Sequence, residues 1–468
     1  MTDAKIIDTS SKKAHGQNKC PACGSTDIAL NIKAGKLQCH SCRKTFDTPT
    51  MQDFLNAHLE NLQGVTIGSG AKEIDEKATA SAMITLKCPS CGAEVVIDSS
   101  AQTSARCHWC RNTLSLNEQI PNGAVPDVVL PFQITKDEAK NLIEDFAGKR
   151  KFYAHPKFSH DFNTDSVMGV YLPYMMINEN THVTANGEGE IKTRSYEVVV
   201  DTDEQGNDIK ETRYDADRYA IKREFDMLVE GLTIESSKTK MDKNAALTNN
   251  IINAIMPFDT EHPLMWNPGF LKGYTFEKRD MNTKDLKKIV QNQTDDIARN
   301  CAKETIKQYD RGVHWNSCKA AIQGQQWLSA YLPVWLFSYQ ETNGDPSTIH
   351  YIAVNGRTKE TMGSIPIYYP KLLLLTLLIE VVCFLVAFFM NKAKDWPWAY
   401  LLLASGLIYF FIIYNRYRNT SARHDYENVT KRKVLHMHKT DERVRHLTNL
   451  KNSRMDNANE DELKGSIY

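Results

Sequence analysis

Residues 372–390 read LLLLTLLIEVVCFLVAFFM, and this stretch decides the class of the protein. A helix rises 1.5 Å per residue, so this stretch is about as long as a hydrocarbon core of roughly 30 Å is thick. Helices of globular proteins seldom run so long without a polar face, which makes a buried core helix the weaker interpretation. We therefore expect a membrane span here.

A second apolar stretch, PWAYLLLASGLIYFFIIY at 397–414, carries no charge, and only NKAKDW separates it from the first. We expect an antiparallel transmembrane hairpin over 369–415. The single intramembrane carboxylate, Glu380, is costly in lipid and should face the second helix, bonded to Ser405 or to an adjacent backbone group. A contact between helices or subunits is favoured over an ion path.

The charges beside these stretches predict their orientation. Arg416, Arg418 and the cluster 431–433 follow the second span, whereas the loop offers Lys392 and Lys394. The excess of basic residues marks the cytoplasmic side, so both termini should be cytoplasmic. The basic tail over 416–468 is expected to be moderately helical. It could be a solvated helix, or it could bind anionic headgroups through Lys431, Arg432, Lys433, Arg443 and Arg445.

The length and the net charge of the chain indicate how many folded units to expect and whether the whole protein attracts nucleic acid. With 468 residues, we expect more than one folded unit. Lys+Arg and Asp+Glu both total 57, so no net charge draws the whole protein to nucleic acid.

Eight of the 11 cysteines form four Cys-x-x-Cys pairs, and each cysteine of the second set lies 68 positions after its counterpart. The pairs are Cys20 with Cys23, Cys39 with Cys42, Cys88 with Cys91, and Cys107 with Cys110. Four thiolates on two tight turns satisfy tetrahedral Zn²⁺, whereas redox pairs seldom come in matched doublets. We expect two structural zinc ions, in ribbons over 17–48 and 83–118.

Other residues of these modules are more ambiguous. His40 and His108 follow ligands that already complete a tetrahedron, so we place them outside the ligand sets. Trp109, beside Arg106 and Arg111, occupies the position of Ser41 in the first module. It could stack on a base, bind a protein, or cover its own hairpin. Residues 49–82 are interpreted as a helix and a flexible linker, which would let the ribbons move independently.

The segment 119–368 predicts an α+β cytosolic domain with an internal repeat. Thr135 and Glu138 form a capping box before an amphipathic helix, and 283–306 has the same periodicity. LPFQ at 130 is matched by MPFD at 256, and YLPYMMI at 171 by YLPVWLFSY at 331. Residues 191–221 alternate polar and apolar residues around EQGND, which predicts a long solvated hairpin. The chain has no phosphate-binding loop, zinc-protease helix or nucleophile elbow, so we do not expect an enzyme.

The CPxCG knuckles, VLPF, GVYLPY, YLPVWLFSY, the VNGRT turn and the terminal spans together resemble bacterial, mainly Gram-positive, membrane-anchored TFIIB-type zinc-ribbon proteins. Such proteins are often mislabelled as relatives of the primosomal helicase, whose motifs are absent here. The resemblance implies docking at a stressed membrane beside PspA-type or SPFH-type proteins.

Two functions follow from these patterns. The favoured one is a membrane-anchored adaptor, which could be a homo-oligomer and would recruit cytosolic proteins to the bilayer. The alternative is a membrane-tethered nucleic-acid binder, and the residues that would contact the nucleic acid are Trp109, Arg106, Arg111, Arg43 and Lys44.

Overall fold

The computed structural model covers the whole chain, of which the following residues are described. They are 5–7, 20–25, 27–48, 50, 59–74, 83–87, 94–98, 104–106, 113–115, 126–202, 208–238, 247–248, 255, 258–260, 263–277, 279–340, 349–394, 402, 404–418, 421–422 and 431–451. The arrangement is multidomain: a cysteine cluster near the N-terminus, a central part rich in sheet, and an apolar helix near the C-terminus.

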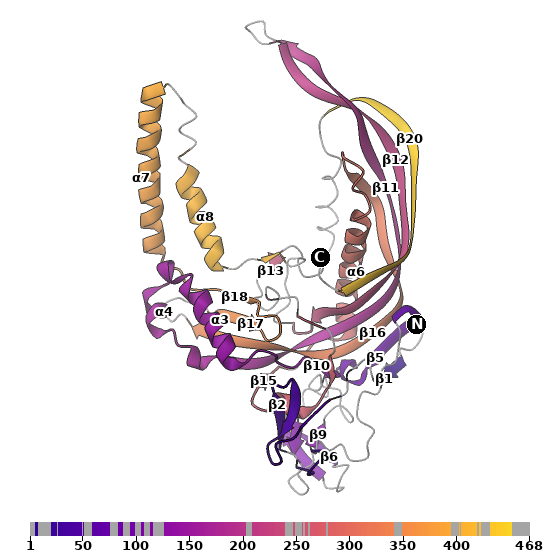
Figure 1. Cartoon of the computed structure of the whole chain (residues 1–468), viewed down its shortest axis with the longest axis vertical. Coiled ribbons are helices and arrows are strands. Elements are labelled where there is room, and N and C mark those ends of the chain that lie inside the picture. Colours follow the sequence, from indigo (N-terminus) through magenta and orange to yellow (C-terminus); the bar gives the residue numbers. More distant parts are fainter. Residues whose placement is uncertain are drawn as a thin grey trace.

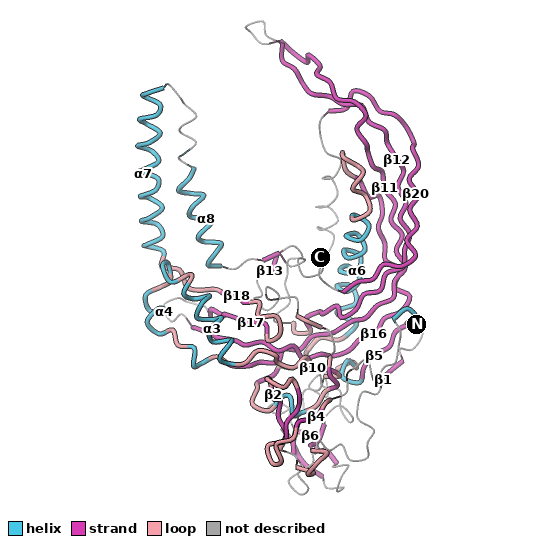
Figure 2. Tube along the Cα trace, in the orientation of Figure 1, coloured by secondary structure: helices cyan, strands magenta, loops and turns pink. Residues whose placement is uncertain are grey.

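One curved sheet organises the molecule (Figures 1 and 2). Its main path runs β1-β5-β16-β11-β12-β20, and shorter strands flank it. The long strands are β11 (Met168–Thr202), β12 (Asp208–Glu235), β16 (Val313–Gln340) and β20 (Lys431–Lys451). The shorter ones are β1 (Lys5–Ile7), β5 (Gly64–Gly68), β10 (Val128–Val129), β14 (Leu264–Met265), β15 (Thr275–Phe276), β17 (Ile349–Asn355) and β18 (Thr361–Gly363). β13 (Leu247–Thr248) pairs separately with β19 (Ser421–Ala422).

The predicted long hairpin is confirmed. β11 and β12 pair antiparallel from Tyr174↔Glu235 to Thr202↔Asp208, and their burial alternates along much of the ladder. Residues 203–207, which contain most of EQGND, lie outside the described residues. We call residues 179–202, 208–230 and 431–451 the sheet arm, which stands upright from a flatter base in Figure 1.

The two Tyr-Leu-Pro segments pair with each other at the centre of the sheet. In the antiparallel ladder of β11 and β16, Tyr171 lies opposite Pro333, and Leu172 opposite Leu332. β10 runs parallel to β16, while β15 runs parallel to β11. β10 leads into α3 (Lys136–Gly148), and β15 leads into α6 (Thr283–Lys303). The segment in the position equivalent to β10 is therefore β15, and the match of MPFD to LPFQ was the wrong alignment.

Both predicted helices of this domain are confirmed. Thr135 accepts a hydrogen bond from the Glu138 N–H, and the Glu138 carboxylate accepts one from the Thr135 N–H. At α6 the Asp285 carboxylate accepts from the Asn282 N–H in the same way. α3 buries Ile143 in one core cluster, and α6 buries Val290 in another.

The remaining short helices flank these elements. α4 (Pro156–Asp161) follows α3, with η3 (Lys151–Tyr153) between them and η4 (Thr164–Ser166) after it. Earlier in the chain, η1 (Leu59–Asn61) and η2 (Ser69–Ala71) border β5. Later in the chain, η5 (Pro268–Leu271) precedes β15.

The prediction of a flexible linker is wrong for 64–74. β5 pairs in parallel with β16, and the η2 turn is buried against Asp127. The Asp127 carboxylate accepts hydrogen bonds from the Gly70 N–H at 2.6 Å and the Ser329 N–H at 2.8 Å. Small residues suggested a linker, but here they allow close packing, since a Cβ on Gly68 would lie 2.3 Å from that carboxylate. Residues 51–58 of the expected helix lie outside the described residues.

Arg279 contacts the η2 turn from the other side, and only 2% of Arg279 is exposed. Its Nε donates to the Gly70 carbonyl at 3.1 Å, and another guanidinium nitrogen donates to the Lys72 carbonyl. Burial lowers the pKa of Arg279 to about 10, and the charge of Asp127 opposes this shift. A buried carboxylate and a buried guanidinium thus fix 69–72 onto the sheet.

A second buried carboxylate, Glu179, lies where β11 shifts register against both of its neighbours. It accepts hydrogen bonds from Thr294 Oγ1 and Gln325 Nε2, both at 2.6 Å. Burial raises the pKa of Glu179, and the two hydrogen bonds oppose the shift only in part. Register shifts of this kind bend a strand and increase its twist.

The predicted helical tail is wrong for 431–451, which form β20 on the edge of β12. The basic side chains that suggested a helix are cross-strand ion-pair partners: Lys431 with Glu230, and Arg443 with Asp217. The fully buried Arg223 pairs with Asp441 of β20. A segment rich in charged residues can form either a solvated helix or a solvated edge strand. Here the pairing with the distant strand β12 determines that it is a strand.

α7 (Tyr369–Lys394) is the described helix long and apolar enough to cross a membrane, and most of its surface is exposed. α8 (Ser405–Arg418) is shorter and packs beside it. Residues 395–401, which begin the second expected span, lie outside the described residues, so the two-span hairpin stays a prediction.

We predict that Asp127→Ala lowers the free energy of unfolding by about 2–5 kcal/mol, because it leaves the buried N–H groups of Gly70 and Ser329 without an acceptor. Chemical denaturation of the full chain in detergent measures this. The exposed Asp137→Ala should change stability by less than about 1 kcal/mol, and equal losses in the two variants would contradict the assignment.

Glu179 gives a prediction about pH. Because its folded pKa is raised, its contribution to stability is complete below its unfolded pKa of about 4.3 and is lost as the pH rises through the folded value. Glu179→Gln cannot ionise, so at pH 7–8 it should match or exceed the wild type, and this advantage should shrink toward pH 4. Unfolding titrations across this range test the idea, with the exposed Glu442→Gln as a control expected to be flat. A constant difference at every pH would refute it.

Candidate metal centre

The first cysteine module contains the same turn twice. The Cys20 carbonyl accepts the Gly24 N–H at 2.8 Å, and the Cys39 carbonyl accepts the Arg43 N–H at 2.9 Å. Gly24 and Arg43 both have positive φ, 71° and 64°. Each turn therefore points the backbone N–H groups that follow its first cysteine toward the sulfurs. Glycine adopts this conformation without strain, whereas Arg43 adopts it at some cost.

A small sheet brings the two turns together. β2 (Ile28–Asn31), β3 (Lys36–Cys39) and β4 (Thr45–Phe46) pair antiparallel, so that the second turn connects β3 to β4 while the first precedes β2. Ser25 Oγ and Ser41 Oγ, 2.8 Å apart, link the turns on the outside.

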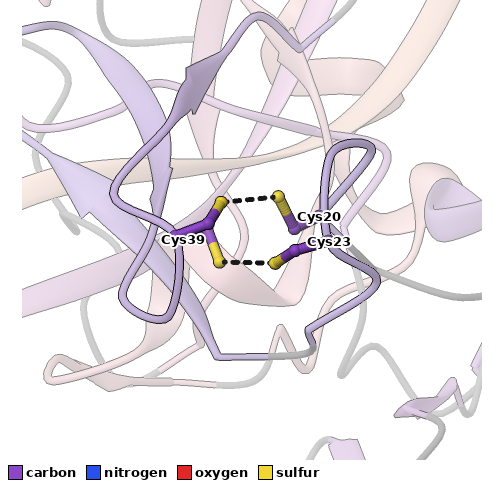
Figure 3. Close-up of side chains that lie close together, drawn as sticks. Cys20, Cys23 and Cys39 are labelled. Carbon is purple, nitrogen blue, oxygen red and sulfur yellow. Dashed lines mark hydrogen bonds between the residues drawn. The ribbon is translucent and has the colours of Figure 1, made fainter.

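The four sulfurs converge on one point (Figure 3). Cys20 Sγ lies 3.5 Å from Cys42 Sγ, Cys23 Sγ lies 3.6 Å from Cys39 Sγ, and all four lie within 4.8 Å of one another. In a tetrahedron with Zn–S bonds of about 2.3 Å, the sulfurs are about 3.8 Å apart. The residues therefore fit a tetrathiolate metal ion, which would cross-link the two turns.

The thiols differ in acidity. The backbone N–H of Cys42 is the main cause that lowers the pKa of Cys39, to about 6, although burial opposes it. Burial also opposes the shift at Cys20, but the N–H groups of Ala22 and Cys23 outweigh it and lower that pKa. For Cys23, the Ser25 N–H favours the thiolate, but the neighbouring thiols outweigh it and raise the pKa to about 12. The turns thus favour thiolates at two of the positions that a metal ion requires to be deprotonated.

The first ribbon is docked on the central domain, which contradicts free movement of this ribbon, whereas free movement of the second ribbon stays a prediction. Phe270 of η5 is fully buried in the same core cluster as Ile28 and Leu37. A Cβ on Gly269 would lie 3.4 Å from each of those two side chains. At the rim, Lys272 pairs with Asp27. Sequence reasoning missed this contact because a single Phe in a loop has no periodic signal.

The second module can be compared through its strands alone. β6 (Met83–Lys87) pairs with β7 (Glu94–Asp98), and β8 (Ser104–Arg106) with β9 (Thr113–Ser115). Ala105↔Leu114 and Arg106↔Thr113 repeat Leu37↔Phe46 and Gln38↔Thr45 of the first ribbon, shifted by 68. Cys88, Cys91, Cys107, Cys110, Trp109, Arg111 and His108 lie outside the described residues.

The other predicted polar positions have defined surroundings. His40 is exposed, and its backbone N–H donates to the Asp27 carbonyl. Glu380 accepts the N–H of Gly406, at the start of α8, at 3.1 Å. Ser405 instead donates to Cys383 Sγ at 3.0 Å. Glu380 thus caps the second helix through its backbone.

Comparison with known proteins adds a relative but no activity. A protein of Bacillus subtilis (strain 168) named "Uncharacterized protein YdjG" is 23% identical to this chain over 355 residues, which make up 75% of this chain and 89% of that protein. No family model and no solved structure matches. The similarity reaches across most of both chains and names no substrate or partner.

We predict that Cys39→Ser in the full chain removes one metal ion and loosens the segment 263–277, since Phe270 packs on the ribbon that the metal cross-links. Elemental analysis measures the first effect, and hydrogen exchange of that segment measures the second. Cys318→Ser, which changes a cysteine outside the cluster, should leave both unchanged. Unaltered metal content in Cys39→Ser would exclude this site.

Proposed function

We propose that this chain is a membrane-anchored adaptor, which holds zinc ribbons at the cytoplasmic face and binds cytosolic proteins there. One observation carries the proposal: the central domain packs against the first cysteine ribbon at one place and against the apolar helix α7 at another. Phe270 buries against the ribbon, while Leu372 of α7 and Tyr417 of α8 are 0% and 3% exposed. A frame that fixes a recognition module relative to a membrane helix suits recruitment.

The proposal includes a second zinc ion at Cys88, Cys91, Cys107 and Cys110. The repeated register of β8 and β9 supports it, because the strands flanking the cysteine pair 107/110 pair as those flanking 39/42 do. Two ribbons of one design could bind two partners or bind one partner twice.

The proposal also includes α8 as part of a second span, with both termini in the cytoplasm. The capping of the α8 N-terminus by Glu380 supports it, because an intramembrane carboxylate needs a donor and the first N–H groups of a helix need an acceptor. The two needs are met together only when the helices lie side by side.

For the partner, we propose a cytosolic protein of the PspA or SPFH type. This choice rests on the resemblance to TFIIB-type zinc-ribbon membrane proteins. Exposed Arg43 and Lys44 on the first ribbon also allow contact with nucleic acid, which is the alternative outcome of the test.

The experiment is affinity capture of the tagged full chain from membranes, with and without nuclease treatment, probed for PspA-type and SPFH-type proteins. We expect wild type and Cys318→Ser to recover the same partner, and Cys39→Ser or Cys107→Ser to recover at least about fivefold less, because each loses one ribbon. Recovery that disappears with nuclease would favour the nucleic-acid function. Equal recovery of the partner by all variants would show that the ribbons do not contribute to binding it.

A further inference from the structure

The base of α7 is surrounded by side chains that the function above does not use. Phe152 of η3 is 59% exposed. Lys371 Nζ donates to the Phe152 carbonyl at 2.8 Å and lies 3.7 Å from the centre of its ring. We call Arg150, Lys151, Phe152, Lys371 and Arg416 the basic collar.

The collar is fixed to both helices. Tyr417 of α8 accepts the Tyr153 N–H at 3.1 Å and donates to the Arg150 carbonyl. Arg150 Nε donates to the Arg416 carbonyl at 3.2 Å. The Tyr368 N–H, just before α7, donates to the Tyr153 carbonyl at 2.8 Å. The collar therefore stays at the end of α7 where the chain enters the helix.

The cations of the collar lack carboxylate partners. Within the described residues, Arg150, Lys151, Lys371 and Arg416 form no ion pair. The nearest pair joins Lys149 to Asp145, one turn earlier in α3. Burial and the charge of Arg416 both lower the pKa of Arg150, as expected for neighbouring cations without a counter-ion.

The basic tail makes the contrast clear. Lys431, Arg432 and Lys433 pair with Glu230, Glu304 and Glu60, at 3.2, 2.7 and 3.0 Å. These three basic side chains are therefore neutralised by carboxylates of the same chain. At the end of α7 where the chain enters the helix, by contrast, the collar cations have no carboxylate partner among the described residues and can meet an external anion.

We propose that the basic collar binds the anionic phospholipid headgroups of the bilayer that α7 enters, with the Phe152 ring in the interface. The collar is continuous with the apolar helix, and its charge is complementary to headgroup phosphates. Aromatic rings favour this depth, and a lysine at a helix end extends its amine toward the headgroups. This inference rests on α7 being a membrane anchor.

The test uses the full chain in nanodiscs of phosphatidylcholine alone or with about 30% phosphatidylglycerol. Acetylation of individual lysines is timed by mass spectrometry. Since each cation at an anionic surface gains about 1 kcal/mol, Lys151 should react about fivefold more slowly in the anionic discs. Lys33, exposed on the ribbon, is the internal control and should change less than twofold.

A variant pair separates lipid contact from a general effect. Lys151→Gln with Phe152→Ser should lose at least half of the preference for phosphatidylglycerol among lipids retained after detergent exchange, whereas Lys33→Gln with Lys36→Gln should keep it. Equal slowing at Lys151 and Lys33, or unchanged retention, overturns the collar while the chain still floats with vesicles. A chain that fails to float overturns the anchor and the collar together.

Discussion

The antiparallel pairing of β11 with β16 is the constraint on which the other parts depend. Near one end of this ladder the two Tyr-Leu-Pro segments face each other. There each strand also pairs with a short parallel strand that leads into the helix of the other half. The aromatic side chains gather around this point: Phe132 lies 4.6 Å from Tyr274 and 4.8 Å from Trp335 between ring centres. The Asn-Gly-Arg turn packs against this aromatic cluster. The Gly356 N–H donates a hydrogen bond to the Pro333 carbonyl, and the Arg357 guanidinium donates one to the Asp259 carboxylate. A side chain at Gly356 would meet the Pro333 carbonyl at 2.7 Å, so the turn tolerates only glycine.

The metal ribbon is coupled to this centre by a short path. Phe270 packs on the ribbon, and four residues later Tyr274 stacks on Phe132 just before β15 joins β11. Order in the ribbon therefore contributes to order in β15. Small zinc modules often gain most of their folding energy from the metal, so a metal ion bound at this cluster would also stabilise a strand of a much larger sheet.

The sequence predicted what is local or strictly repeated. The capping box at Thr135, the periodicity of α6 and the four-cysteine set at 20–42 each depend on residues close together in the chain, and each was found. The errors concern pairing over long distances. GVTIG looked like a linker because its partners, in β16 and at Asp127, are far along the chain. The tail looked helical because the carboxylates that pair with it lie far away in the chain, in η1, at the end of α6 and in β12. No pattern within 431–451 alone could reveal them.

Figure 1 shows α7 and the sheet arm rising from the same side of the base, at the same level. The arm carries exposed charges, among them Arg443 with more than half of its side chain in solvent, and hydrocarbon does not accept such a surface. A flat bilayer threaded by α7 would cut through the arm as well. If α7 lies in such a bilayer, the helix and the arm cannot keep the relative positions of Figure 1, so one of them must move relative to the other.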